Sequence, residues 1–221
     1  MVSLGILSLV TVLILTTSLT GRRDIGAIGA LLIIGVTVWL RGDGLAGLGF
    51  FPPEDWRTTI LWSFLFGIAI QFASTLILEP FSDKITGSAT DHSAFDELRG
   101  NLVYFLLILA GLWAVVVFLE EIIFRGYIMG EIARLMGTSR VALAVNLVLS
   151  SVLFGLAHWY QGKSGALSTG IIGVLLGILF IAGGFNLWFP ILTHGFIDTV
   201  GLFLVYLNAD KFLKERVKIF G

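Results

Sequence analysis

Long apolar runs alternate with short polar segments along this chain. A membrane-spanning helix needs about 20 consecutive apolar residues. The runs that reach or approach this length are residues 2–20, 25–40, 58–78, 101–119, 141–160, 166–182 and 185–207. The fourth run continues in a helical pattern to Met136. The pattern predicts an all-α fold, a polytopic transmembrane helix bundle of about seven spans.

Two longer polar segments separate these runs. Residues 50–57 contain two adjacent prolines, which interrupt a helix, and aromatic residues beside charges, which are typical of a membrane interface. Residues 79–100 carry five acidic and two basic side chains. We expect this second segment to form a surface loop, with His92 in contact with water.

The division of the chain follows from this pattern. We predict a single membrane domain over residues 1–221. Residues 1–100 supply variable amino-terminal spans and the polar loop, and residues 101–207 form the core that carries the candidate chemistry. Residues 208–221 form a basic juxtamembrane tail.

Composition supports a membrane protein and excludes several other classes. The chain is 57% hydrophobic and only 13% charged, which is unlike an ordinary soluble domain. Its 14 basic and 15 acidic residues give a net charge of −1, so nothing indicates a nucleic-acid partner. It has no cysteine, which excludes disulfides, thiolate catalysis and cysteine-based metal sites.

The distribution of basic residues predicts the orientation. Basic residues next to spans favour the cytoplasmic face, and the tail contains Lys211, Lys214, Arg216 and Lys218. Seven spans then place the amino terminus outside and the carboxyl terminus in the cytoplasm, with nine of the 14 basic residues inside. The short loops and the absence of an organelle-targeting extension predict a prokaryotic cell membrane, crossed several times.

Few polar side chains interrupt the apolar runs. They are Gln71, Glu120, Glu121, Arg125, Asn146, His158, Asn186, His194 and Asp198. Ionisable groups at membrane depth are functional candidates, because they face a bundle interior or an aqueous cavity. We expect the three amides to form interhelical hydrogen bonds, and Gly170, Gly173 and Gly177 to allow close helix packing.

The two adjacent glutamates have different expected surroundings. Glu121 and Arg125 are four residues apart on one helical face, in the order that favours an ion pair. Glu120 lies about 100° around the same helix, so this arginine cannot readily neutralise it. Glu120 therefore needs another partner or a hydrated cavity.

Two other helices carry matching polar faces. Phe154 and His158 are four residues apart, as are His194 and Asp198. Glu120 and His158 lie at similar distances from the turn near Gly137, whereas His194 lies closer to the start of its span. Convergence of the three helices therefore requires one helix to tilt or the hairpin at Gly137 to protrude.

These residues resemble a known protein family. The chain has E-E-x-x-x-R at residues 120–125, F-x-x-x-H at 154–158 and H-x-x-x-D at 194–198. Over roughly residues 100–205 this pattern is similar to the type II CAAX prenyl endopeptidases and bacteriocin-processing proteins, also called the Abi or CPBP family. Eukaryotic prenyl proteases have asparagine where Asp198 stands, whereas bacterial and archaeal members often have aspartate.

The resemblance implies an intramembrane endopeptidase that hydrolyses a peptide bond near the membrane surface. The family includes proteins that remove prenylated carboxyl-terminal tripeptides and proteins tied to bacteriocin maturation or self-immunity. The expected partners are membrane lipid and a hydrophobic peptide or protein substrate, prenylated or not, and no nucleic acid.

The residues themselves suit this chemistry. Peptide hydrolysis needs an activated water and a group that stabilises the oxyanion. We expect Glu120 to be the general base, His158 to hold the same water and pass on its proton, and His194, oriented by Asp198, to stabilise the oxyanion. The supporting residues are expected to be Glu121, Arg125 and Phe154.

Alternatives remain open at this stage. Glu120, His158, His194 and Asp198 also match the ligand types of catalytic zinc. We favour no metal, because the histidines come from separate helices and no H-E-x-x-H sequence is present. The other functional alternatives are a proton-coupled membrane transporter, which uses similar buried groups, and a non-catalytic peptide-binding scaffold.

Overall fold

The computed structural model describes residues 2–213, and every regular element in this range is helical. The α-helices are α1 (Val2–Leu19), α2 (Arg23–Arg41), α3 (Trp56–Ala73), α4 (Glu79–Thr86), α5 (Leu102–Gly111), α6 (Val117–Glu121), α7 (Gly130–Met136), α8 (Arg140–Ala157), α9 (Gly162–Ala182) and α10 (Trp188–Tyr206). The π-helical segments are η2 (Ser74–Leu78), η4 (Leu112–Val116) and η5 (Ile122–Met129). The short 3₁₀ helices are η1 (Leu45–Leu48), η3 (Ser93–Leu98) and η6 (Trp159–Gln161).

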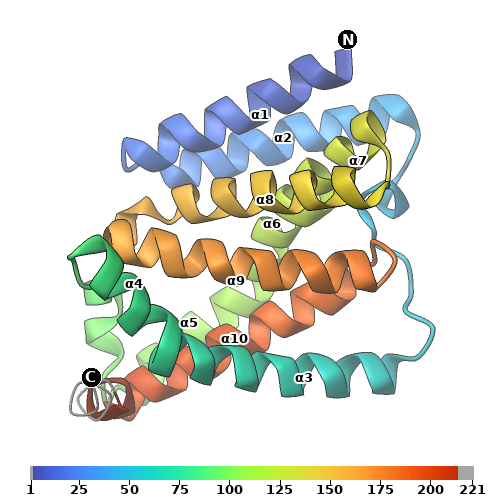
Figure 1. The fold of residues 1–221 in the computed structure, drawn as a ribbon. Helices are drawn as coiled ribbons and strands as arrows, with labels where there is room; N and C mark the ends of the chain where they lie inside the picture. The colour runs from blue at the N-terminus through green and yellow to red at the C-terminus, as the bar shows by residue number, and fades with distance from the viewer. Residues whose placement is uncertain (1, 214–221) are drawn as a thin grey trace.

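The predicted transmembrane bundle is confirmed. Five continuous helices are long and apolar enough to cross a membrane, namely Trp56–Thr86, Leu102–Met136, Arg140–Ala157, Trp159–Ala182 and Trp188–Tyr206. Two shorter apolar helices, Ser3–Leu19 and Ile25–Arg41, bring the total within the described residues to the expected seven. The start of α1 and the end of α10 lie at opposite ends of the bundle (Figure 1).

One long helix crosses the others diagonally. Residues Leu102–Met136 form 35 residues of continuous helix, from α5 through α7, which pass behind α8 and α9 in Figure 1. The π-helical segments η4 and η5 lie on either side of α6, which carries both candidate glutamates. Such local widening of a helix is frequent at functional sites. This tilt brings together the polar residues of the three helices, as their positions in the sequence required.

Side-chain caps fix where several helices begin. Asp55 accepts hydrogen bonds from the backbone N–H groups of Arg57 and Thr58, at 3.0 and 3.2 Å, and so starts α3 after the two prolines. Asn101 accepts from the N–H of Tyr104 at the start of α5, at 3.1 Å. Each cap satisfies backbone donors that the first helical turn leaves without a partner.

Helices α8 and α9 pack through glycines, as predicted. A Cβ atom at Gly155 would lie 2.5 Å from the carbonyl oxygen of Ala166 and 3.1 Å from the Cα of Gly170. A Cβ atom at Gly173 would lie 3.1 Å from the ring of Phe154. The small residues therefore bring the backbone of α9 against the helix that carries Phe154 and His158.

The expected surface loop at residues 79–100 is wrong in two respects. Residues Glu79–Thr86 continue the preceding helix as α4, and Glu79 is buried. His92 is partly exposed, as expected, but it also bonds to Glu79, with 3.0 Å between Nε2 and Oε2. Glu79 can be buried because its carboxylate has a partner in His92, a relation that residue spacing does not reveal.

The amide predictions have mixed outcomes. Asn146 donates to the carbonyl oxygen of Met129 at 2.8 Å and so links α8 to η5, as expected. Asn186 donates to the carbonyl of Phe51 at 2.8 Å and joins two loops rather than two helices. Gln71 donates to Thr75 within its own helix, so its predicted interhelical bond is wrong.

Most of the predicted basic tail lies outside the described residues. Lys214, Arg216 and Lys218 fall there, and Lys211 is exposed just after α10.

Candidate active site

Glu120 lies at the centre of the candidate site. Its Oε2 atom is 3.7 Å from Nε2 of His158 and 3.9 Å from Nε2 of His194. These separations are longer than a direct hydrogen bond. The acid from α6 therefore faces both imidazoles, one at the end of α8 and one in α10.

His158 is oriented by its own helix. Its Nδ1–H donates to the carbonyl oxygen of Phe154 at 2.8 Å. The bond occupies one ring nitrogen and directs the other, Nε2, toward Glu120. His158 lies directly after α8 as its C-cap residue, so the helix end itself places the ring.

His194 is held mainly by Glu121. Its Nδ1–H donates to Oε1 of Glu121 at 2.7 Å, whereas its Nε2 lies 3.4 Å from Oδ2 of Asp198. The expected role of Asp198 in orienting this ring stays a prediction, and Glu121 makes the closer contact. The closer contact joins residues 73 positions apart, which neighbouring positions on one helix could not indicate.

The predicted ion pair between Glu121 and Arg125 is confirmed. Arg125 Nη1 donates to Oε1 of Glu121 at 2.8 Å, and both side chains are buried. Arg125 Nη2 also donates to the carbonyl oxygen of Gly173 at 3.2 Å. This additional hydrogen bond offsets part of the cost of burying the pair, although Oε2 of Glu121 is buried without a hydrogen-bond partner among the described residues.

Phe154 forms a common support for these groups. Its ring centroid lies 4.3 Å from Cζ of Arg125, in cation–π contact. The same ring lies 4.7 Å from the ring of His158 and 6.1 Å, edge to face, from that of His194. One aromatic side chain therefore restricts the positions of both imidazoles and of the guanidinium.

The structure brings all seven predicted residues to one place. The roles assigned to Glu120, His158, His194 and Asp198 remain predictions. Sequence reasoning missed Gly173, whose carbonyl oxygen accepts from Arg125. Its place in the glycine pattern of the sixth run indicated close packing but not this hydrogen bond.

Trp113 supports the helix that carries His194, a contact that no sequence pattern predicted. Its Nε1–H donates to the hydroxyl of Thr199 at 2.9 Å. A Cβ atom at Gly195 would lie 2.3 Å from the indole ring. The ring therefore packs against α10 directly beside His194.

A cavity of about 770 Å³ adjoins the cluster. Glu120, His158, His194 and Asp198 lie on its wall. Its apolar lining residues include Leu107, Ile108, Leu112, Val115 and Leu119. The volume and the mixture of apolar walls with a few polar groups are typical of ligand-binding sites.

The zinc alternative can be compared with the geometry. Across residues 2–213, no group of three or more His, Cys, Asp or Glu side chains has the spacing of a metal centre. Metal analysis of the purified protein tests whether zinc is bound.

Comparison with known proteins adds an independent finding. Residues 102–200 match the family model described as type II CAAX prenyl endopeptidase Rce1-like. The matched segment contains every residue of the candidate cluster. No curated protein and no solved structure matches the chain. The resemblance to CAAX prenyl endopeptidases is thus confirmed over these residues, while the link to bacteriocin processing stays a prediction.

Proposed function

We propose that the protein is an intramembrane endopeptidase in which Glu120 activates the attacking water, on the premise that residues 102–200 match the Rce1-like type II CAAX prenyl endopeptidase family. The family indicates a membrane peptidase. The single observation that supports the role of Glu120 is its position on the cavity wall, facing His158 and His194 at once.

The geometry suggests how the water would be activated. A water between Glu120 and His158 can donate one hydrogen bond to the carboxylate and another to Nε2 of His158, whose Nδ1 proton is held by Phe154. Glu120 then takes a proton as the water oxygen bonds to the carbonyl carbon of the substrate. General base catalysis of this kind contributes about 10²–10⁴-fold to rate.

The second imidazole suits the developing negative charge. Nε2 of His194 faces the carboxylates of Glu120 and Asp198, at 3.9 and 3.4 Å. A protonated Nε2 can donate to the oxyanion, while Glu121 holds the opposite side of the ring. Return of the proton from Glu120 to the leaving nitrogen completes cleavage of the C–N bond.

Replacement of Glu120 tests the proposal. Glu120→Gln keeps the size of the side chain but removes the base, and we expect a loss of turnover of about 10²-fold or more. The assay follows cleavage of a farnesylated CAAX peptide and of the same peptide without the lipid by detergent-purified protein. Glu97→Gln, an exposed glutamate in η3, is the matched control.

The outcomes separate the alternatives. Undiminished turnover in Glu120→Gln would overturn the proposed mechanism. A stoichiometric metal that survives mild chelation would instead favour zinc, bound by Glu120, His158, His194 and Asp198. The ratio of rates on the two peptides shows whether the substrate must be prenylated.

A further inference from the structure

A second polar cluster lies on the wall of the same cavity. It contains Glu79, from the start of α4, and His92, from the segment of residues 87–101 that precedes α5, here called the strap. His92 Nε2 lies 3.0 Å from Oε2 of Glu79. Only 7% of Glu79 is exposed, whereas about a third of the His92 side chain is exposed.

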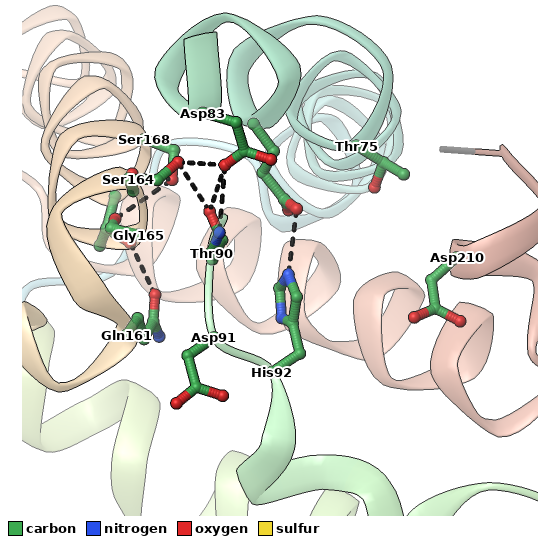
Figure 2. Close-up of polar contacts among 12 residues, drawn as sticks. Thr75, Asp83, Thr90, Asp91, His92, Gln161, Ser164, Gly165, Ser168 and Asp210 are labelled. Atoms are coloured by element: carbon green, nitrogen blue, oxygen red, sulfur yellow. Dashed lines mark hydrogen bonds and ion pairs between the residues drawn. The ribbon is translucent and has the colours of Figure 1, made fainter. Parts of the chain in front are cut away.

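The strap has its own attachments to the bundle. Asp83 accepts from the N–H and hydroxyl of Thr90, at 3.1 and 3.3 Å, and from the hydroxyl of Ser164. The N–H of Asp91 donates to the carbonyl oxygen of Gln161 at 2.9 Å. Figure 2 shows Asp83, Ser164 and Thr90 on one side of His92, with Thr75 and Asp210 on the other. These bonds hold the strap without the help of His92.

The far end of the strap is also fixed. Arg99 donates to both carboxylate oxygens of Asp210, at 2.8 and 2.9 Å. These hydrogen bonds raise the pKa of Arg99 above its usual value. Hydrogen bonds from Ser93 lower the pKa of Asp91, so this carboxylate stays charged at neutral pH.

The second cluster and the candidate active site share one cavity. Thr90 and His92 line it together with Glu120 and His158. The strap also contacts Gln161, three residues beyond His158. A peptide lying in the cavity with its scissile bond at Glu120 can therefore extend along the strap.

The bond to Glu79 determines what His92 can offer to such a peptide. When Nε2–H donates to the carboxylate of Glu79, Nδ1 of a neutral ring carries a lone pair and accepts hydrogen bonds. Among the described residues that line the cavity there is no lysine or arginine, while Glu79 and Asp210 are acidic. The surroundings therefore favour a donor group on the ligand over a carboxylate.

We propose that His92, held by Glu79, is a substrate-binding residue that accepts a hydrogen bond from an N–H group of the peptide substrate. This inference rests on the proposed endopeptidase function, because that function requires a bound peptide with its scissile bond at Glu120. It extends that function by adding a polar contact on the strap, outside the matched family segment.

Two substitutions separate binding by His92 from a purely structural role. His92→Ala removes both ring nitrogens. His92→Gln keeps an N–H that can reach Glu79 but places no acceptor at the position of Nδ1. Affinity is measured in a Glu120→Gln background, which prevents turnover, with fluorescein-labelled forms of the farnesylated and unmodified CAAX peptides. Glu97→Ala, exposed in η3, is the control on the strap.

We expect both His92 variants to weaken peptide binding about 10-fold, with unchanged thermal unfolding in His92→Gln. Wild-type affinity in His92→Gln would overturn the inference, because His92 would then only attach the strap to Glu79. If neither peptide binds the Glu120→Gln protein, the inference is also overturned.

Cleavage by the protein with Glu120 intact distinguishes the two proposals. Glu120-dependent cleavage with unchanged affinity in both His92 variants contradicts this inference and leaves the proposed function standing. Binding that depends on His92, without any cleavage, supports the peptide contact and contradicts the proposed endopeptidase function.

Discussion

At the scale of single residues, one carboxylate oxygen accepts two of the hydrogen bonds that hold the site together. Oε1 of Glu121 accepts hydrogen bonds from both Arg125 and His194, at 2.8 and 2.7 Å. An ionised group in such an interior needs compensation, and removal of its partner leaves a charge whose burial is costly. Glu121 therefore connects the stability of the bundle to the position of an imidazole.

We expect Arg125→Met to lower the free energy of unfolding by about 3–5 kcal/mol, because Glu121 loses its buried counter-charge. Denaturant unfolding in detergent measures the change. The control is Arg134→Met, which removes a half-exposed arginine paired with Asp43 and should cost about 1 kcal/mol or less. If the two substitutions lower the free energy of unfolding equally, burial of the ion pair does not determine its contribution to stability.

Residue spacing predicted only part of this arrangement. The Glu121–Arg125 pair followed from positions four apart on one helix. The contact between Glu121 and His194 did not, because it joins separate helices whose rotation the sequence leaves open. The contact of His92 with Glu79 was not predicted, because a histidine in a polar segment has no nearby pattern that reveals a buried partner.

At the scale of the elements, the contact between α8 and α9 depends on the absence of side chains. Gly155→Ala places a methyl group 2.5 Å from the carbonyl oxygen of Ala166, so the helices must separate. We expect a loss of about 1–3 kcal/mol in the free energy of unfolding.

Gly35→Ala provides the matched control for this helix contact. Gly35 lies within α2, and a Cβ atom there would meet no atom within 4 Å. Helix propensity then predicts a small gain in stability of up to about 1 kcal/mol. A neutral effect of Gly155→Ala in the same unfolding measurement would show that α8 and α9 can move apart freely.

The strap can be tested by cross-linking, because the chain has no cysteine of its own. The hydroxyl oxygens of Thr90 and Ser164 lie 3.0 Å apart, so the double variant Thr90→Cys/Ser164→Cys should form a disulfide on oxidation. If the strap is a fixed wall of the cavity, peptide cleavage continues at the unoxidised rate. A loss of cleavage that reducing agent reverses would show that the strap must move.

Sequence periodicity predicted the existence of the helices better than their details. The run that continued to Met136 proved to be one helix, as expected. The π-helical segments η4 and η5 were not predicted, because one additional residue per turn scarcely changes a uniformly apolar pattern. Residues 79–86 were misassigned because their charges resembled those of a loop.

At the scale of the whole molecule, the predicted orientation can now be tested at defined positions. Ala89, in the strap that follows α4, and Thr138, between α7 and α8, are both exposed. Helix α4 and the turn from α7 to α8 lie at opposite ends of the bundle (Figure 1). Single cysteines at these positions should react differently with a membrane-impermeant maleimide in intact cells. We expect Thr138→Cys to be labelled from outside and Ala89→Cys only after permeabilisation. The reverse pattern would invert the predicted topology.

The diagonal helix makes the geometry of the candidate site sensitive to the lipid itself. A helix of 35 residues is about 50 Å long, whereas the hydrocarbon core of a bilayer is about 30 Å thick. Helices that exceed the membrane adjust to its thickness by tilting. Glu120 lies on this helix, whereas His158 directly follows a helix of 18 residues and His194 lies within one of 19 residues. Acyl-chain length would therefore act as a regulator of turnover, by changing how closely the carboxylate approaches the two rings.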